Sequence, residues 1–485
     1  MLLKNASPFA FEYSRIVNSK RHKGRDRVAA FLGRDTRVGV LALVVCFCQQ
    51  QRTRVLCRSR QPGCPRRGPA PRLQPLEFPV HSIIDDSERH WDCLAERGSG
   101  TAGGEAVMRS RAQMTFDETE EALSRFRVSR ELGFLTRCDM SKMHEYYRPW
   151  IDLCDNMVEL IRKNQVQQAV LQLPLLTTDK LVTYEDWRTA HLLLVTMASG
   201  YLWSGNPKEA PFVLPRSISQ PLTAVSEQLG IRPVICHASA CLANWHLIDN
   251  NQPFSPDNLQ LNAFTFLNSR GNHWFFVVTA QIEKDFAPCI YEIVRAVCFS
   301  IRGKLHYVDS ALSSIVTCLN NASATMKRMN EHLSPKEFYH ELRPFLWGYN
   351  EGSLKQNGII FEGMEDMGHL KYGGGSAAQS STIQLIDAFL KVEHTGAEKD
   401  FLIEQREYMP REHRQLLEWV EASTPVGKST PGREQALEAL RAFRCTHLNT
   451  VAQYILTQIE HPSSTTGTGG TPFMQFLKNV RADTE

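Results

Sequence analysis

Residues 433–458 read REQALEALRAFRCTHLNTVAQYILTQ, and this stretch decides the fold. Its large side chains recur at steps of three and four residues, the spacing that places them on one face of an α-helix. That face consists of Leu437, Leu440, Phe443, His447, Val451, Tyr454 and Gln458. Because a long amphipathic helix needs other elements to cover its apolar face, the sequence predicts a mainly α fold.

Segments earlier in the chain show the same helical spacing. The clearest are 144–200, Trp274–Ile301, Leu312–Glu331 and Ser334–Trp347. The last of these begins with Ser334-Pro-Lys-Glu337, a capping box with proline at the first helical position. Strands and helices do not alternate as a parallel sheet requires, and no internal repeat is visible.

Residues 1–114 differ from the rest of the chain in charge and composition. They hold 20 Lys/Arg and 10 Asp/Glu, whereas the remaining residues hold 35 and 42, which together make the 55 and 52 of the whole chain. The Arg- and Pro-rich stretch 51–72 is typical of a disordered tail and lacks the interleaved aromatics of a nucleic-acid binder. The apolar run 38–48 is too short to span a bilayer. We therefore expect a disordered basic leader and neither a membrane nor a nucleic-acid partner.

The 13 cysteines are scattered, without the CxxC or CxxH spacing of a zinc site and without a CxxCH motif for covalent haem attachment. Free thiols in a reducing compartment explain them best, so the expected location is the cytoplasm.

Two features indicate a ligand site. The segment Tyr372-Gly-Gly-Gly-Ser-Ala-Ala-Gln-Ser-Ser381 lets the backbone approach a bulky group, and its serines could hold an anionic or zwitterionic one. It lacks the lysine of a P-loop, so an ordinary helix-entry loop is the alternative. His447 lies on the apolar face of its helix. A hydrogen-bonded core histidine is one interpretation; the other is an axial haem ligand, with Arg444 one turn earlier placed to meet a haem propionate.

A series of landmarks over about residues 120–483 resembles the indoleamine 2,3-dioxygenase family. They are Tyr147-Arg-Pro-Trp150, Leu214-Pro-Arg216, Cys241-Leu-Ala-Asn-Trp245, Pro335-Lys-Glu-Phe-Tyr339, Leu342-Arg343, the glycine segment 372–381, Tyr408-Met-Pro410, Arg444-x-x-His447, Tyr454-Ile455 and Gly467-Thr-Gly-Gly-Thr471. Each is weak alone, but their order and spacing together are highly specific. His237 and Thr279 stand where the better-known paralogue has tyrosine and serine, so the chain is more similar to the second, lower-activity paralogue. Residues 1–114 match nothing in the family.

The resemblance implies a small N-terminal domain at 115–266 and a large helical haem-binding domain at 267–485, with haem b, one iron per chain, buried between them. It implies a dioxygenase that inserts O2 into the indole C2–C3 bond of L-tryptophan and forms N-formylkynurenine, the first step of tryptophan catabolism to kynurenine. The partners are then L-tryptophan, O2 and an electron donor that reduces the haem, and the protein is expected to be a monomer.

The resemblance also implies individual roles. His447 is the expected iron ligand, and Asp387 with Arg444 the expected pair near a propionate. Arg343 is expected to hold the substrate carboxylate, a task that suits its planar fork. Thr279 is the candidate catalytic hydroxyl, able at most to donate one hydrogen bond. The other expected substrate contacts are His237, Phe338, Tyr339, Gly375, Ser376, Ala377 and the lid residue Thr468.

Several positions depart from the family pattern. Pro344 interrupts the helix that carries Arg343, Trp347 adds bulk, and the lid segment before Gly467 is shorter than usual. Val225 and Phe361 occupy the places of two signalling tyrosines, so a phosphotyrosine docking role has little support. The departures keep a second hypothesis open, a haem-binding protein with little turnover that acts as an interaction or immune-regulatory protein. A helical scaffold without haem is the third.

Overall fold

The computed structural model describes residues 118–300, 302–459 and 473–484, and it confirms a mainly helical fold. Contacts divide the chain into two units, Met1–Arg97 and Gly98–Glu485, and every described residue belongs to the second. The predicted basic leader lies outside the described residues.

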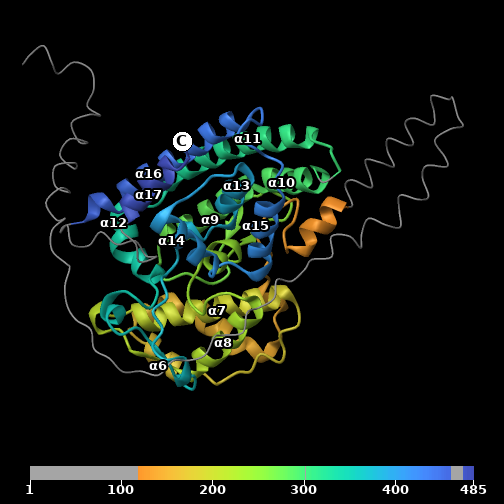
Figure 1. Cartoon of the computed structure of the whole chain (residues 1–485). Helices are drawn as coiled ribbons and strands as arrows, with labels where there is room; N and C mark the ends of the chain where they lie inside the picture. The colour runs from red at the N-terminus through yellow and green to blue at the C-terminus, as the bar shows by residue number, and fades with distance from the viewer. Residues whose placement is uncertain (1–117, 301, 460–472, 485) are drawn as a thin grey trace, which may run out of the picture. The chain divides into compact units, whose positions relative to one another are not determined.

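The first group of helices surrounds one long central helix. Residues 118–125 are helical, and the following helices are α4 (Arg148–Asp155), α5 (Met157–Arg162), α6 (Val166–Leu171), α7 (Tyr184–Trp203) and α8 (Arg216–Leu229). A capping box between Thr183 and Asp186 starts α7. Nearly every residue of α7 from Arg188 onward is buried, because α4, α6 and α8 pack around it. Figure 1 shows α6, α7 and α8 together below the other helices.

The second group builds the larger helical layer. Its helices are α9 (Arg270–Asp285), α10 (Ala287–Ser300), α11 (His306–Lys327), α12 (Pro335–Glu337), α13 (Ser381–Leu390), α14 (Gly396–Arg406), α15 (Arg411–Ser423), α16 (Arg433–Tyr454) and α17 (Phe473–Ala482). Helix α11 packs against α9, α10 and α16. In Figure 1, α11 and α16 run side by side along the upper edge, with α9 and α13 beneath them.

Two predicted helices are broken in the structure. The segment Trp274–Ile301 forms α9 and α10, which are separated at Phe286, because Pro288 in the first turn of α10 has no N–H for a continuous ladder. The segment Ser334–Trp347 is α-helical only over Pro335–Glu337. It continues as a π-helical turn, Phe338–Leu342, and then as a 3₁₀ turn, Arg343–Leu346.

The capping box at Ser334 is half formed. The Ser334 hydroxyl accepts from the Glu337 N–H at 3.2 Å, as predicted. The Glu337 carboxylate does not return to the cap; it accepts instead from the Ser269 hydroxyl at the start of α9. The Glu337 carboxylate therefore connects α12 to the start of α9 instead of completing the capping box.

The described residues also form two short two-stranded sheets, and one of them links the two groups of helices. β1 (Val213–Leu214) pairs in parallel with β4 (Ile360–Phe361), and β2 (His246–Leu247) pairs antiparallel with β3 (Leu259–Gln260). Because β4 follows the Arg343 turn in sequence, the chain returns after that turn to the first group of helices.

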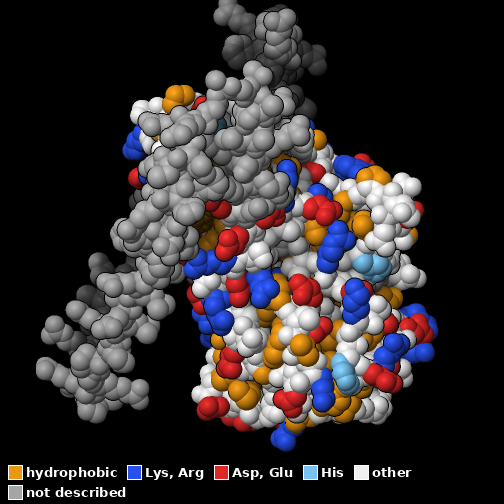
Figure 2. All heavy atoms as spheres, turned by 90° about the vertical axis from the view of Figure 1, so that its right-hand side faces the viewer, with side chains coloured by type: hydrophobic (Ala, Val, Ile, Leu, Met, Phe, Trp, Pro, Cys, Tyr) orange, Lys and Arg blue, Asp and Glu red, His pale blue; other side chains and the backbone are white. Residues whose placement is uncertain are grey.

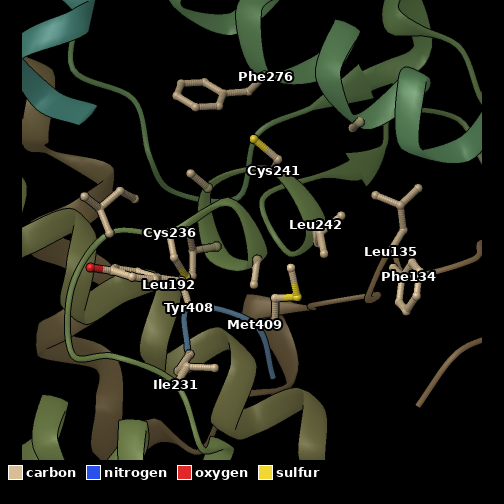
Figure 3. Packing of buried hydrophobic residues seen from close by; sticks show 14 of the residues in the cluster. Phe134, Leu135, Leu192, Ile231, Cys236, Cys241, Leu242, Phe276, Tyr408 and Met409 are labelled. Atoms are coloured by element: carbon tan, nitrogen blue, oxygen red, sulfur yellow. The ribbon is translucent and has the colours of Figure 1, made fainter. Parts of the chain in front are cut away.

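One apolar core extends through both groups of helices. Figure 3 shows it around the turn that carries Cys236, Cys241 and Leu242, with Phe276 of α9 on one side and Ile231 on the other. On the face seen in Figure 2, acidic and basic side chains are intermixed. In the described part of the chain, every cysteine is a free thiol, and none of the helices has the length and apolarity needed to cross a membrane.

Candidate active site

A cavity of about 350 Å³ lies between helices of the second group and the segment 236–241 that precedes them. Its walls come mainly from α9, α13, α16 and α17, with contributions from α11, α14, the turn around 236–241, the 3₁₀ and π-helical turns near Arg343, and the glycine segment. Most of the side chains that face it are apolar, including Phe275, Phe276, Phe338 and Phe443. Its size is in the usual range of pockets that enclose a small molecule.

His447 projects from α16 into this cavity. Burial lowers its pKa to about 4, so the imidazole is neutral at neutral pH. Among the described residues, none forms a hydrogen bond with its ring. The interpretation as a core histidine held by a hydrogen bond is therefore not supported, whereas a neutral, uncommitted imidazole is the form that binds a metal.

Asp387 and Arg444 lie on the same side of the cavity and form a buried ion pair. Arg444 Nη2 donates to both carboxylate oxygens of Asp387 at 2.7 Å. Burial opposes the charged carboxylate, but Arg444 and His394 outweigh it and hold the pKa of Asp387 below its usual value. Arg444 Nη1 also donates to the Val480 carbonyl at 3.2 Å and to the Thr484 hydroxyl. The predicted pair is therefore assembled, and it is connected to α17.

Arg343 reaches the cavity from the 3₁₀ turn, next to Phe338 from the π-helical turn. The arginine is 6% exposed, and burial lowers its pKa from the usual value, although Tyr339 and Glu351 oppose this change. Arginine starts from so high a pKa that it stays charged. A buried guanidinium facing an apolar cavity is a strong site for a carboxylate.

The two departures near Arg343 have visible structural effects. Pro344 stands at the second position of the 3₁₀ turn and ends the wider turn before it, so the predicted bend is present. Trp347 does not line the cavity; its ring packs edge-on against Trp203 at a centroid distance of 5.4 Å. Tyr339 is also absent from the cavity wall, and its ring centroid lies 5.2 Å from the Arg343 guanidinium.

His237 and Thr279 face the cavity, and both are already hydrogen bonded. Thr279 donates to the Phe275 carbonyl, one turn earlier in α9, at 2.7 Å. His237 Nε2 lies 2.8 Å from Glu283 Oε1. Burial disfavours the imidazolium, yet contacts with Cys241 and Glu283 raise the pKa of His237 well above its usual value. The histidine is therefore held as a cation against the wall.

Glu283 is a cavity residue that the sequence analysis missed. Besides His237, it accepts from the Ser380 hydroxyl at 2.8 Å and from the Thr382 hydroxyl at 2.6 Å. Burial would raise the pKa of Glu283, but His237 and the two hydroxyls lower it. The available signal was its position one helical turn after Thr279, which puts both side chains on one face of α9.

Gly375, Ser376 and Ala377, the expected substrate contacts of the glycine segment, line the cavity. Ser376 caps the short turn that follows, accepting from the Ala378 N–H at 3.3 Å. The close approach predicted for the glycines occurs against protein rather than ligand: a Cβ on Gly374 would lie 2.0 Å from the Leu346 carbonyl oxygen. The loop is thus pressed onto the turn that bears Arg343. Thr468 lies outside the described residues.

Comparison with known proteins agrees with this geometry. A family model described as "Indoleamine 2,3-dioxygenase" matches residues 122–485. Indoleamine 2,3-dioxygenase 2 of Homo sapiens is 30% identical over 386 residues, covering 75% of this chain and 94% of the relative. Indoleamine 2,3-dioxygenase 1 of Mus musculus is 32% identical over 382 residues, covering 74% and 93%. A protein named myoglobin from Haliotis madaka is 33% identical over 378 residues, covering 75% and 98%.

Proposed function

Because this chain belongs to the indoleamine 2,3-dioxygenase family of haem-dependent oxidoreductases, we propose that it inserts both atoms of O2 into the C2–C3 bond of L-tryptophan and forms N-formylkynurenine. The observation that carries the proposal is one cavity with a neutral imidazole from α16 and a buried guanidinium from the 3₁₀ turn. The first is the side chain that a haem iron needs, and the second is the side chain that an amino-acid carboxylate needs.

The cavity residues fit haem b with one iron. His447 offers a ring nitrogen without a competing hydrogen bond from the described residues, and the aromatic walls suit a flat macrocycle. Arg444 is the cation nearest in sequence to His447 that could meet a propionate, and it would do so while paired with Asp387. When bound, the haem would supply the iron that activates O2 for addition to the indole.

The chain's own contribution is orientation and exclusion of water. Arg343 would fix the carboxylate of tryptophan, while Phe338 and the phenylalanines of α9 would hold the indole. Both carboxylates that line the cavity are engaged, Glu283 with His237 and two hydroxyls, and Asp387 with Arg444. Among the described residues, the wall therefore offers no carboxylate poised as a general base, which is compatible with a reaction by direct addition.

The test is turnover by the purified, haem-loaded and reduced protein with L-tryptophan under air. We expect the absorbance of N-formylkynurenine to appear and, with isotopically labelled O2, both labelled atoms to be found in the product. A haem spectrum with reversible O2 binding but no product would contradict the proposal and favour a haem protein with little turnover. The similarity to a protein named myoglobin makes this control necessary.

Replacing Thr279 by alanine or valine is expected to change kcat/KM by less than about threefold, or ~0.7 kcal/mol. The reason is that its hydroxyl already donates to the Phe275 carbonyl. Steady-state kinetics of both variants measure the effect. A loss of about a hundredfold in the valine variant, which keeps the shape but not the hydroxyl, would instead assign a catalytic hydrogen bond to Thr279.

The remaining partners belong to the same proposal. An electron donor must keep the iron reduced, and the protein acts as a monomer. The free thiols of the described residues agree with a cytoplasmic location.

A further inference from the structure

A buried cluster of four charged side chains lies between α13, α16 and α17. Besides the pair Asp387–Arg444, it contains His394 from the loop after α13 and Asp483 from the end of α17. His394 Nε2 lies 3.2 Å from Asp387 Oδ2, and its Nδ1 lies 3.0 Å from Asp483 Oδ2. The side chains of His394, Asp387 and Arg444 are each less than a tenth exposed. One imidazole thus joins a carboxylate of α13 to a carboxylate that directly follows α17.

The two contacts of His394 require a particular charge state. A ring that donates from both nitrogens is an imidazolium, because the neutral ring has only one N–H. With His394 protonated, two cations balance two carboxylates. Without that proton, a buried cluster would carry an uncompensated negative charge, and one ring nitrogen would direct its lone pair at a carboxylate.

Helix α17 forms part of the cavity wall through Phe476, Leu477 and Val480. Among the described residues, the polar contacts between α17 and the rest of the protein come from residues 479–484, at the end of the helix and directly after it. Arg444 donates to the Val480 carbonyl, Arg441 Nη1 donates to the Thr484 carbonyl at 3.0 Å, and Asn479 donates to Glu398 of α14. His394 connects this end of α17 to Asp387 through Asp483, alongside the connection that Arg444 makes. Figure 1 shows α17 lying alongside α16, which carries His447.

We propose that His394 is a positioning residue of the haem site, which acts through Asp387 and Asp483 to hold Arg444 and helix α17 against the cavity. The inference rests on the proposed function only in that the cavity takes haem. His394 itself does not line the cavity, so its effect on the cofactor is indirect. Loss of the bridge should free α17, open the wall beside Arg444 and allow bound haem to leave faster.

The direction of the pH dependence follows from the groups that face His394. Burial opposes its charged form, but Asp387 and Asp483 prevail over this and over Arg444, and they raise its pKa above the ordinary 6.5. A histidine whose pKa rises on folding stabilises the folded arrangement fully below its unfolded pKa and loses that contribution as pH rises through the folded value. Haem retention should therefore weaken as pH rises above 6.5.

The experiment measures haem transfer from the loaded protein to excess apomyoglobin between pH 6 and 9, for the native chain, His394→Gln and Asp483→Asn. At pH 6 we expect both variants to lose haem roughly tenfold faster than the native chain, a change of about 1.4 kcal/mol. The rate of haem loss from the native chain should increase with pH and approach that of the variants. The variants should lack the part of this pH dependence that His394 causes. The exposed His369 gives the matched control, His369→Gln, which should behave as the native chain does.

Amide hydrogen exchange of α17 in the haem-free protein is the second readout. Protection should fall in His394→Gln and, in the native chain, with rising pH. The inference would be overturned if the native chain and the variants lost haem at the same rate at every pH and the amides of α17 were equally protected in both. If the native protein takes up no haem at all, the proposed function fails, and exchange of α17 alone then decides the role of His394. His237 also faces the cavity, pairs with Glu283 and can contribute a pH dependence of its own. Only the difference between the pH profiles of haem loss of the native chain and His394→Gln is therefore assigned to His394.

Discussion

His447→Ala is expected to abolish stable haem binding. The imidazole is the ring on α16 that faces the cavity, is neutral at pH 7 and has no hydrogen-bond partner among the described residues. Removing it takes away the one protein ligand proposed for the iron, whereas apolar contacts alone hold a macrocycle weakly and without a defined axial signature. The Soret absorbance per polypeptide after reconstitution measures the effect, and we expect a loss of more than about tenfold.

Two controls separate a missing ligand from a damaged fold. His369→Ala removes an exposed histidine and should leave haem loading unchanged. His447→Gly leaves a gap that free imidazole can fill, so added imidazole should restore the haem spectrum. Full loading of the alanine variant with an unaltered axial signature would remove His447 from the role of ligand.

Arg343→Ala is expected to raise the KM for L-tryptophan by roughly one to two orders of magnitude. A buried, charge-assisted bond to a carboxylate is worth about 1.5–3 kcal/mol, and its loss mainly weakens substrate binding. Arg343→Lys should recover only part of the effect, because an ammonium cannot reproduce the planar fork. Steady-state kinetics under air provide the values.

Tryptamine makes this prediction specific, since it has the indole ring but no carboxylate. With tryptamine the native chain and Arg343→Ala should have similar KM values, within about threefold. An equal loss for both substrates would show that the arginine supports the structure of the cavity rather than the carboxylate. The exposed Arg162, replaced by alanine, is a suitable surface control.

The periodic helices could be predicted from sequence because their apolar stripes are local signals. The stretch 433–458 forms α16 as far as Tyr454, with a 3₁₀ turn after it. The breaks were harder to predict. Pro288 stands at a position that a helix start tolerates, so the stripe continues across the junction of α9 and α10. Pro344 was visible, but the wider turn before it depends on packing that no local spacing reports.

The candidate site was predictable only in part for a related reason. His447 stands out because a polar residue interrupts an apolar stripe, and the glycine segment stands out by composition. Glu283 and His394 look like ordinary charged residues in sequence. Glu283 pairs with His237, 46 positions earlier, and His394 bridges Asp387 to Asp483, which lies 89 positions later, so these pairings emerge only in three dimensions. The helical spacing already put Arg444 one turn from His447, whereas Asp387 and its pairing with Arg444 came from the resemblance, and in the structure the two are in contact.

The π-helical turn Phe338–Leu342 has a consequence for how this pocket could change over time. It holds one residue more than an α-helical turn would, directly before the arginine. Deleting a single residue there would restore the tighter repeat and swing every later side chain by about 100° around the axis. A one-residue deletion, rather than a substitution, is therefore the change that would redirect Arg343 most directly. It would fit the pocket of a related protein to a carboxylic acid of different shape.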